Sequence, residues 1–351
     1  MKTLQNFDVK GKRVLVRCDF NVPLGDQGEI LDDFRIKETI PTIEYLLKEG
    51  AKIILMSHLG RPEGKVVEEL RLTPIQERLT EYLGLKVLKT EDCLAGEIEE
   101  LTKKMESGEV LLLENLRFHK EEEENDAAFA KGLAKLGDIY INDAFGASHR
   151  THASIVGVPK YLPSAAGLLL EKEINVLTKL GTNPERPLVA IIGGAKAEKK
   201  SKLIDKLSRV ADFILIGGIL QREIKEKNIK LESPQKIIEP VDEIGGGMDI
   251  GPKTVALFKE KISQAKTVFW NGPLGMVEKE EFARGTKAIF QAIIDAGSFS
   301  VLGGGETVAL FQKLGLTEKF NHVSTGGGAM LEFLSGEKLP GIEALNSRSG
   351  N

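Results

Sequence analysis

The stretch Leu188–Leu207 (LVAIIGGAKAEKKSKLIDKL) constrains the fold of this chain more than any other. It begins as an apolar run rich in β-branched residues, which is typical of a buried parallel strand. Gly193 and Gly194 interrupt the run, and apolar residues resume at helical spacing from Leu203. A strand, a glycine turn and a helix in this order make a phosphate site in α/β folds, because glycines expose backbone N–H groups and the helix N-terminus adds partial positive charge.

Two lysines, Lys196 and Lys200, lie in this turn and in the first turn of the helix that follows. Cations at a helix N-terminus oppose the helix dipole, so their presence needs a reason. One interpretation is a phosphate bound between them. The other is a solvated lysine face with no ligand.

The second half of the chain repeats this arrangement of an apolar strand and a glycine turn, usually followed by a helix. It occurs five times, at Val189–Lys196, Phe213–Leu220, Thr267–Gly275, Ser300–Phe311 and His322–Leu334. Glycine turns at the ends of parallel strands predict a crevice in which a nucleotide lies close to backbone. The sequence holds neither GxGxxG nor a Walker A loop, and the first absence argues against an NAD-dependent dehydrogenase.

Five apolar runs in the first half are predicted strands, and helical patterns such as 40–48 and 75–83 separate most of them. The runs are Val14–Val16, Lys52–Met56, Lys86–Leu88, Val110–Leu113 and Ile139–Ile141. This alternation predicts a mostly parallel sheet. Arginine, histidine and polar residues follow four of these strands: Arg17, Asp19 and Asn21; Ser57, His58 and Arg61; Asn115, Arg117 and His119; Asn142, Asp143, His149, Arg150 and His152.

Because ligands bind beyond the carboxyl ends of parallel strands, these side chains predict an anion pocket. Arginine suits that role, since its planar guanidinium holds phosphate or carboxylate oxygens in pairs. Arg35 is expected at a helix start, after two aspartates. The run Glu121–Glu124 is expected to be a solvated face or a helix start.

A chain of 351 residues is too long for one ordinary core, so two domains are expected. We predict a first domain at 1–166, a connecting helix and linker at 167–186, a second domain at 187–334 and a C-terminal segment at 335–351. The net charge of −4 and the pI of about 5.9 argue against general nucleic-acid binding. Two cysteines without metal spacing, and the lack of a long apolar run or signal-peptide core, favour a reduced, cytoplasmic protein without a membrane partner.

Seven motifs spread over nearly the whole chain closely resemble the phosphoglycerate kinase family, and they occur in that family's order. They are RCDFNVPL (17–24), SHLGRP (57–62), LENLRFH (113–119), DAFGASHRTHAS (143–154), GGAK (193–196), WNGPLG (270–275) and STGGGA (324–329). The final LPGIEAL (339–345) resembles the C-terminal segment that returns to the first domain of these proteins. The resemblance implies an α/β fold with two Rossmann-like parallel-sheet domains joined by a helix hinge.

The resemblance also implies a function: reversible, Mg²⁺-dependent phosphoryl transfer from ATP to 3-phosphoglycerate, giving 1,3-bisphosphoglycerate and ADP, by a monomer whose domains close around a hinge near 167–181. By position, the triose phosphate would contact Asp19, Asn21, Arg35, His58, Arg61, Arg117 and Arg150. The nucleotide would contact Gly194, Ala195, Lys196, Lys200, Gly218, Gly247, Met248, Asn271, Pro273, Glu278, Gly303, Gly304, Gly305, Glu306 and Thr307. The residues that would act in catalysis are Arg35, Lys196, Gly304 and Gly327, and Glu306 would bind the metal ion.

The chain departs from the family pattern in its second half. Glu306 stands where the family usually has aspartate, Ala197-Glu198 replaces a valine and an aspartate, and 219–221 differs from the usual run. The stretch from Leu220 to Met248 is several tens of residues shorter than the family norm, so a strand–helix portion should be missing or rebuilt. A second hypothesis is therefore a non-catalytic binding or scaffold protein on the same fold.

Overall fold

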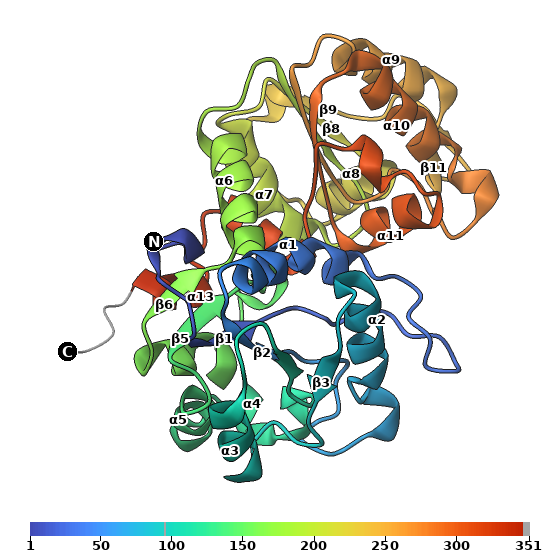
Figure 1. Cartoon of the computed structure of the whole chain (residues 1–351). Coiled ribbons are helices and arrows are strands. Elements are labelled where there is room, and N and C mark those ends of the chain that lie inside the picture. Colours follow the sequence, from blue (N-terminus) through green and yellow to red (C-terminus); the bar gives the residue numbers. More distant parts are fainter. Residues whose placement is uncertain (95, 347–351) are drawn as a thin grey trace. The chain divides into compact units, whose positions relative to one another are not determined.

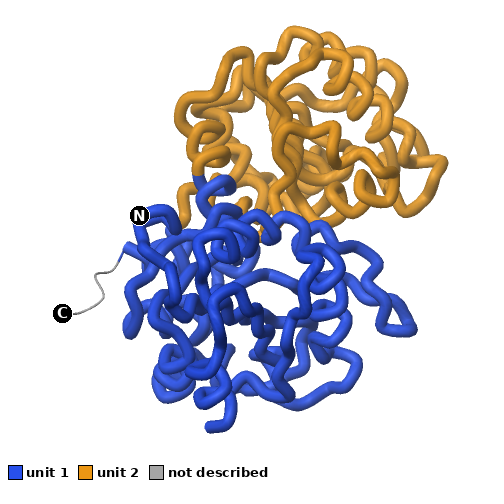
Figure 2. Tube along the Cα trace, in the orientation of Figure 1, with its two compact units in different colours: residues 1–174, 338–351 blue, residues 175–337 orange. Residues whose placement is uncertain are grey.

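The structure is a computed structural model that describes residues 1–94 and 96–346, and the chain divides into two compact units (Figure 2). Unit 1 comprises Met1–Ile174 and the segment that begins at Lys338, and unit 2 comprises Asn175–Glu337. The division falls within one helix, α6 (Leu168–Thr182), so this helix connects the two units.

Unit 1 is built on a parallel sheet of six strands in the order β3-β4-β2-β1-β5-β6 (Figure 1). The strands are β1 (Arg13–Arg17), β2 (Lys52–Met56), β3 (Val87–Lys89), β4 (Val110–Leu112), β5 (Ile139–Asn142) and β6 (Ser164–Ala166). All five predicted strands are confirmed, each within one residue at either end. The sequence does not predict β6, because serine and alanine carry no β-propensity signal.

The order of these strands reverses beside β1, which lies between β2 and β5. From β1 the sheet continues through β2 and β4 on one side and through β5 and β6 on the other. Arg17 and Asn142, the last residues of β1 and β5, pair in register. Such a reversal opens a crevice beyond the carboxyl ends of the strands, where α/β proteins bind ligands.

The helices of unit 1 are α1 (Phe34–Lys48), α2 (Thr73–Leu83), α3 (Gly96–Lys104), α4 (Lys120–Glu123), α5 (Ala127–Ala134) and α13 (Pro340–Asn346). Helix α1 buries Ile36, Ile43 and Leu46 in the core that includes the apolar side chains of β1 and β2. This spacing puts the three side chains on one face of the helix, which explains why the amphipathic pattern is visible in the sequence.

Two features tie the ends of unit 1 together. Asp143, directly after β5, accepts hydrogen bonds at Oδ1 from the backbone N–H groups of Leu169 (2.9 Å) and Leu170 (3.2 Å), so it holds the start of α6. Helix α13 packs on β6, and Gly341 N donates to Ser148 O at 2.8 Å. The predicted return of the C-terminal segment to the first domain is therefore confirmed for the residues up to Asn346; residues 347–351 lie outside the described part of the chain.

Unit 2 contains a second parallel sheet of six strands, in the order β14-β13-β12-β7-β8-β9 (Figure 1). The strands are β7 (Leu188–Ile192), β8 (Phe213–Ile216), β9 (Ile237–Ile238), β12 (Thr267–Asn271), β13 (Phe299–Gly303) and β14 (His322–Val323). The five predicted apolar segments all form strands of this sheet. Its order reverses beside β7, which lies between β8 and β12, so the turns after β7 and β12 are neighbours.

Helices α7 (Ala197–Ser208), α8 (Gly218–Glu226), α9 (Pro252–Ile262), α10 (Arg284–Ala296), α11 (Gly305–Lys313) and α12 (Gly327–Leu334) complete unit 2. A small antiparallel hairpin, β10 (Glu243–Ile244) with β11 (Asp249–Ile250), precedes α9. Within the described residues, no helix has both the length and the apolar character needed to cross a membrane.

Candidate active site

Unit 1 gathers arginines around two buried histidines beyond the carboxyl ends of its strands. Arg17 Nη2 lies 3.2 Å from His58 Nδ1, and both side chains are buried. Burial, together with Arg17, Arg117 and Arg35, holds the pKa of His58 well below its usual value. Burial and the same basic surroundings lower the pKa of His152 to about 3. Both histidines are therefore neutral at pH 7, and the positive charge of this cluster comes from its arginines.

The predicted polar residues of unit 1 form one hydrogen-bonded layer. Arg35 Nη1 donates to Asn21 O at 2.8 Å and lies 3.4 Å from Asp19. The Asn21 side chain accepts from Gly60 N at 2.8 Å, and Arg117 Nη1 donates to Gly60 O at 2.9 Å. The loops after β1, β2 and β4 are thus joined through backbone groups, as the sequence predicts for strand ends that meet at one edge.

Arg61 and Arg150 differ from the arginines of this layer because their side chains are exposed. Arg150 is close enough to Arg117 and His152 to lower the pKa of each, so it belongs to the basic cluster. Arg61 directly follows Gly60, whose backbone joins the loops after β1 and β4.

One buried acid of this cluster is not predicted by the sequence. Glu122, on α4, is fully buried and accepts hydrogen bonds from Ser154 Oγ (2.6 Å) and Ser154 N (2.9 Å). Ser154 Oγ in turn accepts from Arg17 Nε at 2.8 Å. The expectation of a helix start at Glu121–Glu124 is confirmed, but the expectation of a solvated face is wrong for Glu122, because its charge is needed opposite buried Arg17. Nothing in a run of four glutamates marks the one that turns inward.

The glycine turns of unit 2 meet at the reversal point of the second sheet. Gly193 N donates to Asn271 O at 2.9 Å, and Gly194 N donates to Pro273 O at 2.8 Å. A Cβ on Gly193 would overlap the carbonyl oxygen of Pro273, so only glycine fits there. The turns after β13 and β14 also approach each other, since a Cβ on Gly327 would lie 3.3 Å from Gly305 N.

The two lysines of the first turn have different surroundings. Lys200 is partly buried, and its ammonium donates to Gly193 O. Burial lowers its pKa to about 8, although Glu306 and Glu223 act in the opposite direction. Lys196 is exposed and holds a left-handed backbone conformation (φ 71°) immediately before α7. The solvated-face interpretation is therefore wrong for Lys200, whereas Lys196 is exposed beside the turn.

Two polar atoms among the predicted nucleotide residues are buried without a hydrogen-bond partner in the described part of the chain: Asn271 Nδ2 and Thr307 Oγ1. A Cβ on Gly304 would lie 2.9 Å from Asn271 Nδ2, so this amide faces the turn after β13. Glu306 is exposed on the first turn of α11, and its Oε2 would lie 4.0 Å from a Cβ on Gly194. Buried polar groups rarely go unpaired, so these atoms indicate a site that a ligand completes.

The hairpin β10–β11 brings a further group of predicted residues together. Gly247 is buried against Arg222, whose Nη2 donates to Gly246 O at 2.6 Å. Gly218, the first residue of α8, packs against the side chain of Glu243. Met248 is 36% exposed and accepts at its carbonyl from Met276 N at 2.7 Å. Glu278, two residues after Met276 in the chain, is exposed.

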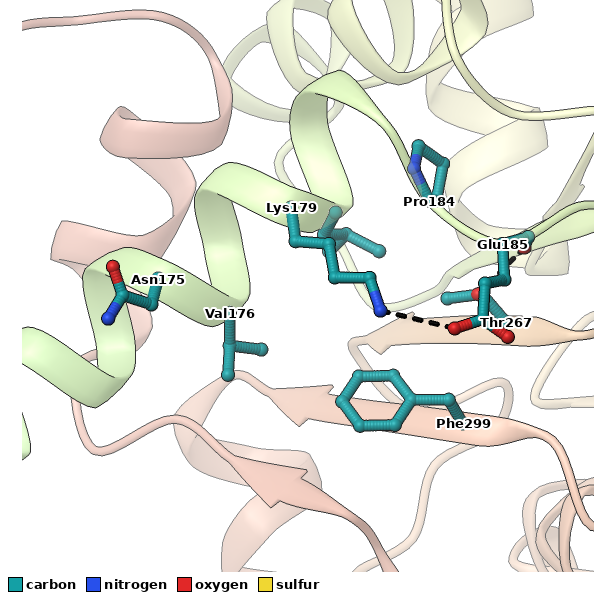
Figure 3. A pocket seen from close by; sticks show the side chains of 8 residues that line it. Asn175, Val176, Lys179, Pro184, Glu185, Thr267 and Phe299 are labelled. Atoms are coloured by element: carbon teal, nitrogen blue, oxygen red, sulfur yellow. Dashed lines mark hydrogen bonds and ion pairs between the residues drawn. The ribbon is translucent and has the colours of Figure 1, made fainter.

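A separate cavity of about 200 Å³ lies elsewhere in unit 2 (Figure 3). It is lined by the end of α6 and by Thr267 and Phe299, the first residues of β12 and β13. Lys179 extends over it, 3.1 Å from Glu185 and 5.8 Å from the centre of the Phe299 ring. The cavity is at the amino ends of these strands, whereas the glycine turns are at their carboxyl ends, so it is distinct from the candidate active site.

Comparison with known proteins gives one consistent answer. The family model for phosphoglycerate kinase matches residues 4–234 and 220–337. The phosphoglycerate kinase of Dictyoglomus turgidum is 47% identical over 390 residues, covering 98% of each chain, and that of Gloeothece citriformis is 45% identical over 396 residues. The chain belongs to the phosphoglycerate kinase family.

Solved structures of phosphoglycerate kinases agree with this assignment. That from Coxiella burnetii matches with a TM-score of 0.83 at 34% identity and covers 99% of each chain. That from Pyrococcus horikoshii matches with a TM-score of 0.86 at 35% identity and covers 99% of this chain and 98% of the other. The predicted fold class is therefore confirmed for both units.

The comparisons also locate the shortened segment. The alignment with the Dictyoglomus phosphoglycerate kinase runs over 390 positions, more than the 351 residues of this chain, so the relative carries several tens of residues that this chain lacks. The phosphoglycerate kinase model matches in two parts that overlap at residues 220–234. This is where α8 ends, and the next strand of the sheet, β9, has only two residues. The strand that follows the shortened segment, β9, is thus a two-residue strand at the edge of the sheet.

Proposed function

We propose that this chain binds 3-phosphoglycerate on unit 1 and ATP on unit 2, and catalyses reversible phosphoryl transfer between them. The carboxylate oxygen of 3-phosphoglycerate attacks the γ-phosphorus of ATP, the bond from that phosphorus to the oxygen of ADP breaks, and an acyl phosphate forms. The reverse reaction makes ATP. The observation that carries this proposal is the presence of one anion-binding cluster in each unit of a phosphoglycerate kinase family member.

The assigned residues on unit 1 neutralise the triose phosphate. Arg35, Arg117 and Arg150 supply charge, while neutral His58 offers hydrogen bonds without adding a further cation to a crowded cluster. Asp19 and Asn21 orient Arg35. Because the acceptor is a carboxylate that is ionised at neutral pH, the reaction needs no general base. Arg35 therefore acts by offsetting negative charge as the phosphoryl group approaches.

The assigned residues on unit 2 hold the nucleotide phosphates. Lys200 contacts the phosphate chain beside the first glycine turn, whose Gly193 and Gly194 N–H groups stay bonded to Asn271 O and Pro273 O, and exposed Lys196 contacts the transferred phosphoryl group. Gly304 and Gly327, at the starts of α11 and α12, lie close together, since a Cβ on Gly327 would be 3.5 Å from Gly304 Cα, and their backbone N–H groups are assigned to the transferred phosphoryl group. Asn271 Nδ2 and Thr307 Oγ1 gain partners when the nucleotide binds. Gly247, Met248 and Glu278 are assigned to the nucleoside.

The residues present fit a magnesium ion carried with the nucleotide. Mg²⁺ prefers oxygen ligands and is commonly held by one or two carboxylates together with substrate phosphates. Glu306 supplies such a carboxylate beside the first glycine turn, and the unpartnered hydroxyl of Thr307 is its neighbour in the chain. When bound, the ion neutralises phosphate charge. Glu306 would hold the ion from the first turn of α11, with a side chain that is one methylene longer than that of aspartate.

Because the two substrates are assigned to different units, we expect the units to close around them, and the hinge near 167–181 remains a prediction. The test is ATP-dependent turnover of 3-phosphoglycerate, followed by coupled oxidation of NADH, in the presence and absence of Mg²⁺. Saturable turnover that EDTA abolishes is the expected result. A folded sample without turnover that binds 3-phosphoglycerate but not MgADP in calorimetry would instead support the scaffold hypothesis.

A further inference from the structure

A carboxylate from α8 occupies the start of the helix that we assign to the nucleotide phosphates. Ala197 is the first residue of α7, and its N–H donates to Glu223 Oε2 at 2.7 Å. Lys196, in the capping position before it, makes no side-chain capping bond. The amide at the positive end of this twelve-residue helix is thus satisfied by an acid from another helix rather than by a local cap.

The same acid also acts on the lysine of the turn. Glu223 and Glu306 are the two acids that raise the pKa of Lys200 against the effect of its burial, so both carboxylates lie within electrostatic reach of its ammonium. Glu223 therefore interacts with two of the groups on which the proposed phosphate site depends, the N-terminus of α7 and the Lys200 ammonium. Carboxylate and phosphate oxygens compete for such groups because both are anionic acceptors.

The position of Glu223 depends on how α8 is held. Its neighbour Arg222 donates to Gly246 O at 2.6 Å and lies 3.7 Å from Glu243, so the hairpin β10–β11 fixes this part of the helix. Both α8 and the hairpin flank the shortened segment, which begins at the junction of the two family matches. Glu223 therefore lies on a short helix that the hairpin β10–β11 holds beside the first glycine turn.

We propose that the Glu223 carboxylate is an internal competitor of the nucleotide phosphates, so that ATP and ADP bind only when Glu223 leaves the N–H of Ala197. This inference rests on the proposed function, because it assumes that the phosphates use the first glycine turn. It assigns to Glu223 the role of setting nucleotide affinity. A hydrogen bond to a charged group is worth about one to two powers of ten in an equilibrium constant, so its removal should tighten nucleotide binding by about tenfold or more.

The test compares MgADP affinity, measured by calorimetry, in the wild type and in the variants Glu223→Ala and Glu223→Gln. Glu223→Ala removes both the charge and the acceptor, and it should bind MgADP about tenfold more tightly. Glu223→Gln keeps an acceptor for Ala197 N–H without the charge, so its affinity should lie between the two. The matched control is Glu226→Gln, which removes the same charge from an exposed position on the same helix and should bind as the wild type does.

Steady-state kinetics separate competition from a general structural role. Removing a competitor should lower the KM for ATP and leave the KM for 3-phosphoglycerate unchanged, whereas a damaged unit 2 would lower kcat. If Glu223→Ala does not fold, the MgADP affinity of Glu223→Gln alone tests the inference. The inference would be overturned if the wild type binds MgADP and is active, but the folded Glu223 variants bind MgADP no more tightly than the wild type. A wild type that neither binds MgADP nor turns over would instead refute the proposed function.

Discussion

The replacement Lys200→Met gives the clearest quantitative test of how unit 2 is organised. Lys200 is partly buried beside the first glycine turn, and burial lowers its pKa from 10.5 to about 8. Each unit of pKa shift corresponds to about 1.4 kcal/mol, so a charged Lys200 costs the folded state up to about 3 kcal/mol at pH 7. Methionine has a similar length and carries no charge.

The sign of the pH dependence follows from which state holds the proton. Between pH 8 and 10.5 the lysine is neutral in the folded state and charged in the unfolded state, so the unfolded state binds more protons and stability rises with pH. From the same values, the wild type should gain about 1.4 kcal/mol from Lys200 between pH 7 and pH 9. Lys200→Met should be about 2 kcal/mol more stable at pH 7, after about 1 kcal/mol for the lost hydrogen bond, and should lack this rise.

The assay is urea unfolding followed by tryptophan fluorescence at pH 7, 8 and 9. The chain has a single tryptophan, Trp270, which is buried in β12, so its emission reports on unit 2. The control is Lys199→Met, at an exposed neighbouring position, which should shift stability by no more than about 0.5 kcal/mol. The same Lys200→Met variant should lose MgADP binding. If it is less stable than the wild type at pH 7, or rises in stability with pH as the wild type does, the burial argument is refuted.

Three further substitutions test other parts of the structure. Arg35→Ala should lower kcat by about a hundredfold while weakening 3-phosphoglycerate binding much less, as measured by turnover and calorimetry; the reverse pattern would show that Arg35 mainly binds substrate. Gly193→Ala should destabilise unit 2 by about 3 kcal/mol in urea, because a Cβ there overlaps the carbonyl of Pro273; an unchanged midpoint of Trp270 fluorescence would contradict this. Burial raises the pKa of Asp143 to about 6, so the folded state holds a proton that the unfolded state releases, and the contribution of Asp143 to wild-type stability should fall by about 2.4 kcal/mol as pH rises from 4 to 7. Asp143→Asn keeps the acceptor for Leu169 N–H and should remove this fall in circular-dichroism melts; a fall of the same size in the variant would exclude Asp143 as its cause.

Local patterns in the sequence predict most of the fold. Apolar runs of β-branched residues give the strands of both sheets, and the glycines that follow five of them give the turns, because both signals depend on neighbours in the chain. The positions of Arg17, His58 and Arg117 at or just after the ends of β1, β2 and β4 predict that they converge, since all parallel strands end at one edge. The chemistry of an anion site is thus present in the sequence before any contact is known.

The tertiary structure decides which charged groups are paired and which remain available to a ligand. The order of strands places the turn after β7 beside the turn after β12, and nothing local in the sequence specifies that neighbour. Burial selects Glu122 from a run of four glutamates, because Arg17 leaves an uncompensated charge in the core. Glu223 lies 26 positions after Ala197 in the chain, yet it accepts from the first amide of α7, a contact that only packing creates. Sequence therefore determined the elements and the type of chemistry, whereas long-range packing determined which acids pair with the buried arginine and with the amide and lysine of the first glycine turn.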